Sequence, residues 1–338
     1  MTEASIKANV ANLLHKARQG EILDREELIE LLKWPAASEE AMATIAAGGA
    51  ISREISGNKG ETHAQFALNL GPCKCNCVFC SFAQVNGIFT EETRITLEEA
   101  LEFARNFETQ KANAIYVMTT AGYSFGQFIE FMQEVRQVIK PETPLIANVG
   151  DKTLEQCKKM QAAGITGVYH AIRIREGVDS DLAPEARKRS IRNFQEAGLK
   201  VGTCVEPLGP EQTPEEIADA IVFSGSFGAA HSGAARRITI PGTEIAKRGM
   251  ISELRMAQIV AITRLGVPRS ILGHCTHEPC ALGAVAGANL FWAEVGANPR
   301  DIEAKTEKGR GHTLQHSRDL YGEADWEIFD GSSRYFTE

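Results

Sequence analysis

The sequence predicts an α/β protein whose main body is a (β/α)₈ TIM-type barrel, preceded by a helical extension and followed by a tail. Two observations support this fold class. From residue 62 onward, short runs rich in β-forming residues alternate with amphipathic stretches eight times, which is the pattern of parallel βα units. Cysteines, arginines, histidines and carboxylates also gather where those runs end, and barrels of parallel strands collect their functional residues there.

Helices are expected in residues 1–50. Apolar residues at helical spacing predict a helix over 5–19, an acidic run starting at Asp24 opens a second helix, and Pro35 ends it. The barrel itself is expected in residues 51–298, and a C-terminal tail packed on the barrel in residues 299–338. No internal repeat or linker is evident, and a chain of 338 residues has the usual length of one closed barrel.

The expected strands lie at 64–70, 114–119, 145–149, 167–174, 200–206, 236–240, 269–273 and 288–293. The expected helices between them lie at 96–108, 125–139, 153–163, 184–197, 213–225, 251–265 and 279–287. The last strand overlaps an apolar stretch, 281–293, that could also be largely helical.

Composition narrows the class of protein. Apolar residues make up 43% and charged residues 24% of the chain, which are ordinary values for a soluble protein. A net charge of -8 gives a nucleic acid partner no electrostatic support. The charged N-terminus lacks the apolar core of a signal peptide, and Asn289 interrupts the longest apolar stretch, so we expect a cytoplasmic protein without a membrane span. Eight cysteines in such a chain favour metal binding or catalysis over disulfides.

Four cysteines lie within eight residues, in the segment GPCKCNCVFCSFA that follows the first expected strand. A zinc site usually takes two separated cysteine pairs, and no second pair lies close by. Thiolates spaced along one irregular loop also suit an iron–sulfur cluster. The set Cys73, Cys77 and Cys80 would hold three irons of a [4Fe–4S] cube and leave the fourth iron open. A structural zinc knuckle or a disulfide pair is the alternative.

This C-x₃-C-x-Φ-C pattern, with Phe79 before its last cysteine, closely resembles the radical S-adenosylmethionine (SAM) superfamily. The resemblance implies that Cys73, Cys77 and Cys80 ligate a SAM-binding [4Fe–4S] cluster and that Phe79 lies near the adenine of SAM. It also implies reductive cleavage of SAM to a 5′-deoxyadenosyl radical. Cys75 is extra to the pattern and is expected not to be a ligand.

Further SAM-binding residues are implied by the same resemblance. The turn Thr119, Thr120 and Gly122 occupies the position where the superfamily receives the SAM amino group, although it departs from the usual G-G-E. The segments YHAIRIREGVDSD and GTCVEPLGPEQTPEE resemble the branch that contains biotin synthase, the hydrogenase maturase and the methylornithine and lipoyl synthases. That likeness implies that Arg173 or Arg175 pairs with the SAM carboxylate, and that Glu176 or Glu206 holds the ammonium or ribose. Ordinary ion pairs are the alternative for these four residues.

A second metal site is expected from Cys204, Cys275 and Cys280, because the ends of the fifth and seventh strands should meet at the barrel mouth. We interpret these three as catalytic ligands of an auxiliary iron–sulfur cluster, and Cys157 as a core residue. Ser332, in the tail segment DGSSRYF, is similar in place to a cluster-ligating serine of lipoyl synthase, which makes it a further candidate ligand. His274 and His277 flank Cys275 and could bind zinc or tune a cluster.

These expectations combine into a radical SAM sulfurtransferase that inserts sulfur from the auxiliary cluster into an unactivated C–H bond. The expected chemistry is of the lipoyl-synthase type on an octanoyl-bearing lipoyl-domain protein, or of the biotin-synthase type on a small molecule. A one-electron donor such as ferredoxin or flavodoxin would be a partner. The first alternative is a hydrogenase-maturase or methylornithine type of reaction without sulfur transfer. The second alternative is a non-enzymatic metal-binding scaffold protein.

Overall fold

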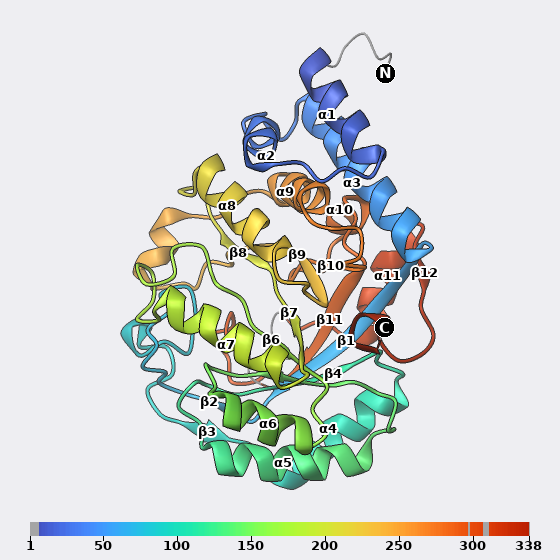
Figure 1. The fold of residues 1–338 in the computed structure, drawn as a ribbon. Helices are drawn as coiled ribbons and strands as arrows, with labels where there is room; N and C mark the ends of the chain where they lie inside the picture. The colour runs from blue at the N-terminus through green and yellow to red at the C-terminus, as the bar shows by residue number, and fades with distance from the viewer. Residues whose placement is uncertain (1–6, 297, 307–310, 338) are drawn as a thin grey trace.

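A curled parallel sheet forms the body of the molecule in the computed structural model, which describes residues 7–296, 298–306 and 311–337 (Figure 1). Nine strands follow one another in the order β7-β6-β5-β4-β1-β11-β10-β9-β8. Their bounds are β1 (Lys59–Ala67), β4 (Ile115–Met118), β5 (Leu145–Asn148), β6 (Gly167–Tyr169), β7 (Lys200–Gly202), β8 (Val205–Leu208), β9 (His231–Arg236), β10 (Gly273–Cys275) and β11 (Leu290–Val295).

The two edge strands of this sheet, β7 and β8, follow each other directly in the chain. Strands β7 and β8 are separated by Thr203 and Cys204 alone. The amide of Ala230 donates to the carbonyl of Val201 (2.8 Å), and the amide of Thr203 donates to the carbonyl of His231 (3.0 Å). These hydrogen bonds join β7 to the start of β9, so residues 200–208 close the barrel that the sequence predicts.

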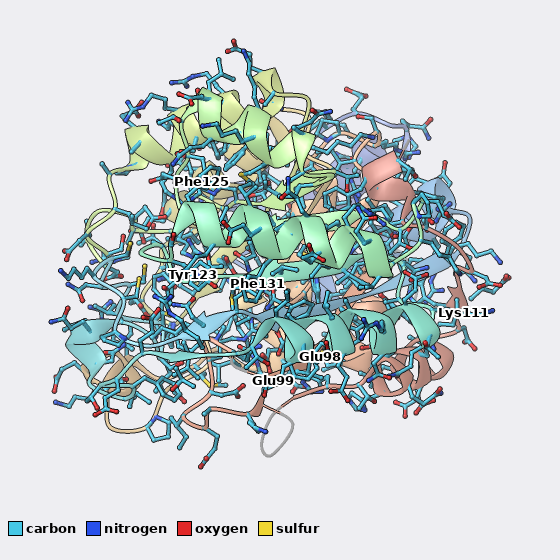
Figure 2. All side chains as sticks on the ribbon, turned by 90° about the horizontal axis from the view of Figure 1, so that it is seen from below. Glu98, Glu99, Lys111, Tyr123, Phe125 and Phe131 are labelled. Atoms are coloured by element: carbon cyan, nitrogen blue, oxygen red, sulfur yellow. The ribbon has the colours of Figure 1, made fainter. Side chains whose placement is uncertain are left out.

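Helices cover the outside of the barrel (Figure 1). Several begin where a threonine side chain caps the first turn; Thr96, Thr153 and Thr213 each form a capping box. In Figure 2, α4 and α5 lie side by side along the barrel, with Glu98 and Glu99 in the first turn of α4. The helices are α4 (Leu97–Thr109), α5 (Phe125–Val138), α6 (Leu154–Ala162), α7 (Pro184–Glu196), α8 (Pro214–Gly225), α9 (Glu253–Gly266), α10 (Ala281–Val285) and α11 (Leu314–Glu323).

Three N-terminal helices form an additional layer over α8 and α9: α1 (Ala8–Arg18), α2 (Arg25–Leu32) and α3 (Glu39–Ser56). Helix α3 crosses α9 very closely, because a Cβ added at Gly48 would lie 2.7 Å from the Cα of Ala261. The third helix runs six residues past the expected boundary at residue 50, and Gly57 ends it with a φ of 65°.

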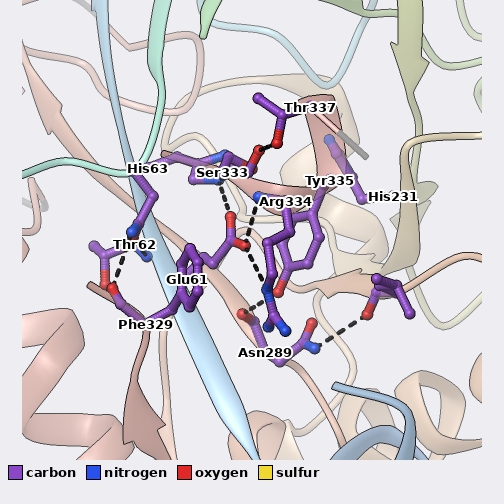
Figure 3. A network of polar contacts seen from close by, with 12 residues as sticks. Glu61, Thr62, His63, His231, Asn289, Phe329, Ser333, Arg334, Tyr335 and Thr337 are labelled. Carbon is purple, nitrogen blue, oxygen red and sulfur yellow. Dashed lines mark hydrogen bonds and ion pairs between the residues drawn. The ribbon is translucent and has the colours of Figure 1, made fainter. Parts of the chain in front are cut away.

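The tail packs on the barrel and reaches its interior. Strand β12 (Glu327–Ile328) pairs with the start of β1, and α12 (Arg334–Thr337) follows it. Tyr335 and Phe336 join the apolar cluster inside the barrel. Figure 3 shows the polar contacts around them, at the N-terminal end of the strands, where Glu61 contacts His63 (3.0 Å) and accepts a hydrogen bond from the amide of Arg334 (3.0 Å).

Four short elements complete the chain around the barrel: β2 (Asn69–Leu70) pairs with β3 (Thr93–Arg94), and η1 (Gln84–Asn86) and η2 (Glu244–Arg248) are single 3₁₀ turns. Among the described residues, no helix combines the length and apolarity needed to cross a bilayer.

Two predicted strands are wrong in position. The expected strand 236–240 is mostly loop, and the strand there is β9, which starts five residues earlier. The expected strand 269–273 overlaps the observed strand β10 only at Gly273, where β10 begins. Both strands lie deep in the barrel and are made of small or polar residues, His-Ser-Gly-Ala-Ala-Arg and Gly-His-Cys. Such residues have low β propensity. The β-branched residues 238–240, on which the prediction of strand 236–240 was based, lie in the loop after β9.

Candidate active site

A cavity of about 200 Å³ lies at the C-terminal ends of the strands. Each part of the barrel contributes to it: the cysteine loop after β1, the turn after β4, the segment after β6, and the ends of β8, β9 and β11. The cavity lies where a barrel of parallel strands places its chemistry. The polar and sulfur-bearing lining residues include Gln65, Cys73, Cys75, Cys77, Cys80, Tyr116, Met118, Thr119, Thr120, Asn148, Tyr169, Arg173, Arg187, Glu206, Arg236, Arg237, His277, Glu294 and Arg300.

The cysteine loop is held in shape by its own backbone. The amide of Cys73 donates to Phe82 (2.7 Å), and the amide of Cys80 donates to Cys77 (2.8 Å). Asn76 adopts a left-handed φ of 47°, which asparagine tolerates better than most residues. Its side-chain amide reaches the carboxylate of Asp181 (2.8 Å), on the segment after β6. The loop is therefore fixed both to itself and to a neighbouring strand end.

All four loop thiols face the cavity, and their donor chemistry fits an iron–sulfur cluster. Burial raises the pKa of the Cys77 thiol to about 11 and that of Cys80 to about 12. A hydrogen bond from Cys75 lowers the pKa of Cys73 to about 6 and raises that of Cys75. Several soft ligands on one anchored loop satisfy the requirement for thiolate ligation by iron. Because Cys75 contacts Cys73, its exclusion from the ligand set stays a prediction.

Arg173 and Glu206 form a polar bridge across the cavity. The guanidinium of Arg173 lies 5.8 Å from the centre of the Phe79 ring and 3.6 Å from the carboxylate of Glu206. Glu206 also accepts a hydrogen bond from Tyr169 (2.7 Å) and contacts Nδ1 of His277 (2.9 Å). Burial alone would raise the pKa of Glu206, but the charges of His277 and Arg173 hold it at about 2. The carboxylate therefore stays ionised between two cations.

Not every predicted SAM-binding residue faces the cavity. Thr119 and Thr120 line it, whereas Gly122 lies on the exposed side of the same turn. Arg175 has a left-handed φ of 63° and pairs with Asp179 (2.9 Å), outside the lining. Glu176 is buried beneath the segment after β6, where it accepts hydrogen bonds from the amide of Arg173 (3.1 Å) and the hydroxyl of Ser180 (2.6 Å). The structure thus gives Glu176 an anchoring role.

The structure brings together two of the three cysteines predicted for a second metal site. Cys204 and Cys275 are 2% and 0% exposed and lie beneath the cavity floor, and His277 joins them, with all three donor atoms within 4.8 Å of one another. Burial opposes the charge of His277, but the carboxylate of Glu206 raises its pKa to about 9.

Cys280 and Ser332 lie elsewhere. Cys280 caps the first turn of α10, where its sulfur accepts a hydrogen bond from the amide of Gly283 (3.3 Å). Ser332 lies between Gly331, which accepts from the side chain of Asn113 (2.7 Å), and Ser333, whose amide donates to the Asn113 carbonyl (2.8 Å). Asn113 precedes β4, so Ser332 sits at the barrel end remote from the cysteines. The expected auxiliary set of Cys204, Cys275, Cys280 and Ser332 therefore needs correction.

Besides Arg187 on α7, which pairs with Asp151 (3.2 Å), three arginines of the cavity were not predicted from the sequence. Arg237 pairs with Glu211, Arg236 with Glu253 (3.0 Å) and Arg300 with Glu294 (2.6 Å). They follow β9 and β11, so the strand-end rule identifies them once those strands are placed in the correct register.

Comparison with known proteins agrees with the fold and with the resemblance to radical SAM enzymes. No model of a known protein family matches the chain. Two similar curated proteins are biotin synthases: that of Sulfurihydrogenibium sp. (strain YO3AOP1) is 23% identical over 277 residues, which are 78% of this chain and 80% of the relative. That of Anaplasma marginale (strain Florida) is 23% identical over 281 residues, with coverages of 79% and 85%.

Two solved structures share the whole architecture. The [FeFe]-hydrogenase maturase HydG from Carboxydothermus hydrogenoformans has a TM-score of 0.79 at 18% identity, over 97% of this chain and 80% of that one. Methylornithine synthase (PylB) has a TM-score of 0.77 at 17% identity, with coverages of 96% and 98%. The fold and the cysteine loop define a radical SAM barrel enzyme. Within that superfamily, the similarity to biotin synthases and to the two solved structures supports the biotin-synthase-like branch.

Proposed function

We propose that this protein is a radical SAM enzyme that takes a hydrogen atom from a small anionic molecule bound in the cavity. One observation carries the proposal: the cysteine loop, the Arg173–Glu206 bridge and four further arginines line the same cavity. A [4Fe–4S] cluster and SAM, when bound, supply a 5′-deoxyadenosyl radical. Cys73, Cys77 and Cys80 would hold the cluster.

The chain's own residues would bind and orient the reactants. Arg173 is half-buried between Glu206 and Glu176, whose charges raise its pKa, so it offers a fixed cation beside the cysteine loop. Such a guanidinium suits the carboxylate of SAM. Thr119 and Thr120 offer hydroxyl and backbone groups on the neighbouring turn. Aromatic walls from Phe79, Tyr169 and Trp292 exclude water from the space between.

The substrate class follows from the arginines at the ends of β9 and β11. Among the described residues, Nε of Arg236 and Nε of Arg237 are buried without a hydrogen-bond partner. A carboxylate or phosphate group that reached the cavity would meet these guanidinium groups and compete with the glutamates that pair with them. A small one-electron donor such as ferredoxin or flavodoxin would supply the electron.

The test is anaerobic reconstitution of the full chain, followed by reduction in the presence of SAM. We expect about four irons per chain and the release of methionine and 5′-deoxyadenosine. Cys77→Ala should lose both the iron and the SAM cleavage, whereas Cys75→Ala should retain both. A reduced, iron-loaded wild-type protein that yields neither product would refute the proposal.

Sulfur insertion is a second candidate, favoured by the likeness to biotin synthases and by the close approach of Cys204 and Cys275. It would make the protein a sulfurtransferase, acting on an octanoyl-protein in the lipoyl manner or on a small precursor in the biotin manner. This candidate requires an auxiliary cluster, so about eight irons with matching sulfide should be found. A content of about four irons and four sulfides would leave the first proposal standing and exclude this one.

A further inference from the structure

A group of soft metal ligands lies directly beneath the proposed radical-generating cavity. Cys204 comes from the junction of β7 and β8, Cys275 from the end of β10, and His277 from the loop after it. Their donor atoms all lie within 4.8 Å of one another. In a tetrahedral zinc site with bonds of about 2.3 Å to sulfur and 2.0 Å to nitrogen, neighbouring donors are about 3.5–3.8 Å apart. Small side-chain shifts would therefore complete the set.

The histidine of this group is already oriented for metal binding. Its Nδ1 contacts the carboxylate of Glu206 at 2.9 Å, and Glu206 is held in turn by the hydroxyl of Tyr169 at 2.7 Å. A carboxylate on one ring nitrogen fixes the orientation of a ligating histidine and raises the basicity of the other nitrogen. His277 also makes a side-chain hydrogen bond with Cys275, and Nε2 is the atom that would bind an ion in place of that hydrogen bond.

A second buried imidazole marks the site independently. His231 is completely buried, and its ring lies against Cys275. Within the described part of the chain, its Nδ1 has no hydrogen-bond partner. Its Nε2 lies 3.4 Å from the hydroxyl of Tyr116, which leaves Nδ1 without a partner among the described residues, beside one buried thiol. Such a nitrogen is costly in an apolar interior, unless a bound group compensates it.

The number and placement of the donors favour a single ion over a cluster. Iron–sulfur clusters commonly take four protein ligands, but the structure separates Cys280 and Ser332 from this group. Two thiolates and one imidazole are a known zinc set that keeps a fourth position open. Of the three residues, His277 alone lines the cavity, so the open position would face the cavity on that side.

We propose that Cys204, Cys275 and His277 bind one divalent transition-metal ion, zinc or ferrous iron, whose open position takes a heteroatom of the substrate. Such an ion would fix the substrate at the floor of the cavity, below the cysteine loop. This inference adds to the proposed radical chemistry but does not depend on it, and it competes with the sulfur-insertion candidate.

The experiment uses the full chain with its loop cluster loaded, so that the loop cysteines are occupied. After dialysis against zinc and then against buffer, elemental analysis should find about one zinc per chain. X-ray absorption at the zinc edge should show two sulfur and one or two nitrogen or oxygen neighbours. Cys275→Ser and His277→Ala should each lower zinc affinity at least 10-fold. The matched control is Cys280→Ser, since serine is also a good helix cap, and it should keep the zinc.

Three outcomes would overturn the inference. The first is that the protein retains no zinc after dialysis, and that a parallel dialysis against ferrous iron adds no iron beyond that of the loop cluster. The second is a zinc shell of four sulfurs, which would point to the loop. The third is acid-labile sulfide that disappears with Cys275→Ser, which would indicate a cluster. The wild-type absorption spectrum decides the question even if the buried Cys275→Ser variant does not fold. SAM cleavage in the same preparation tests the proposed function separately.

Discussion

Arg173 and Arg175 are two residues apart in the chain and occupy different environments. Arg173 points into the cavity beside Phe79, whereas the left-handed backbone at Arg175 directs its side chain to Asp179 outside the lining. The sequence alone left the choice between the two open, because both follow the same strand. The backbone conformation separates them, and it is not encoded by residue type, since arginine rarely adopts a positive φ.

We expect Arg173→Gln to weaken SAM binding about 10- to 100-fold, because a buried charge-assisted hydrogen bond contributes about 1.5–3 kcal/mol. Arg175→Gln should bind SAM within about 3-fold of the wild type, because it removes a partly exposed ion pair of small energy. Equilibrium dialysis of iron-loaded protein with SAM measures both variants. Equal losses in the two variants would show that Arg173 has no special place in the site.

The C-terminal segment acts as part of the barrel core although it follows the last strand. A Cβ added at Gly167 in β6 would lie 2.6 Å from the Phe336 ring, and one at Gly273 in β10 would lie 2.8 Å from Tyr335. Glycine at these two positions makes room for the aromatic rings. The rings fill the space that bulky strand residues fill in many barrels.

Phe336→Ala should therefore destabilise the protein by about 3–5 kcal/mol, as expected for deleting a buried aromatic side chain. Denaturant unfolding measures this loss. Val178→Ala, at a residue that is 70% exposed, is the control and should change the unfolding free energy by less than about 0.5 kcal/mol. A similar small change for Phe336→Ala would mean that the tail is not part of the core.

The bounds of most helices could be predicted from the sequence. The strands that were predicted wrongly share one physical cause. Helices with threonine caps and a polar outer face, such as α4 and α6, agree with their predicted bounds to within a residue or two. Strands β9 and β10 do not, because barrel interiors that hold small residues and cysteines lack the β-branched signal. Tyr335 and Phe336 lie inside the barrel because they pack against β6 and β10. The local sequence pattern cannot predict such contacts between distant segments.

Across the whole molecule, the site depends on residues that meet only when the barrel closes. The cysteine loop is predicted from local spacing alone. The grouping of Cys204, Cys275 and His277 requires β7, β8 and β10 to be placed together, and the exclusion of Cys280 requires the start of α10. Sequence spacing favoured Cys280 over His277, and the three-dimensional structure reverses that choice.

The free energy of unfolding should fall at acidic pH because of His170. This side chain is 1% exposed, contacts Asp151 (3.1 Å) and lies near the cation of Arg187; burial, aided by that cation, lowers its pKa to about 3. The unfolded chain takes up the proton near pH 6.5 while the folded chain does not, so stability is lost as the pH falls below about 6.5. Between pH 7 and pH 5 this amounts to about 2 kcal/mol.

His170→Gln should flatten that part of the pH dependence, as measured by urea unfolding at pH 7, 6 and 5. The exposed His15, changed to Gln, is the matched control and should leave the wild-type slope unchanged. An unaltered slope in His170→Gln would remove this residue from the explanation of acid sensitivity.

The use of Tyr335 and Phe336 to fill the barrel has a consequence for biosynthesis. A ribosome must release residues up to 337 before the apolar cluster that contains Cys204, Cys275, Tyr335 and Phe336 is complete. The cysteine loop is made about 125 residues before Cys204 and about 195 residues before Cys275, so it leaves the exit tunnel before either of them. The proposed loop cluster would thus receive its metal before the proposed site of Cys204, Cys275 and His277, and a fusion partner attached to the C-terminus would interfere with the second site.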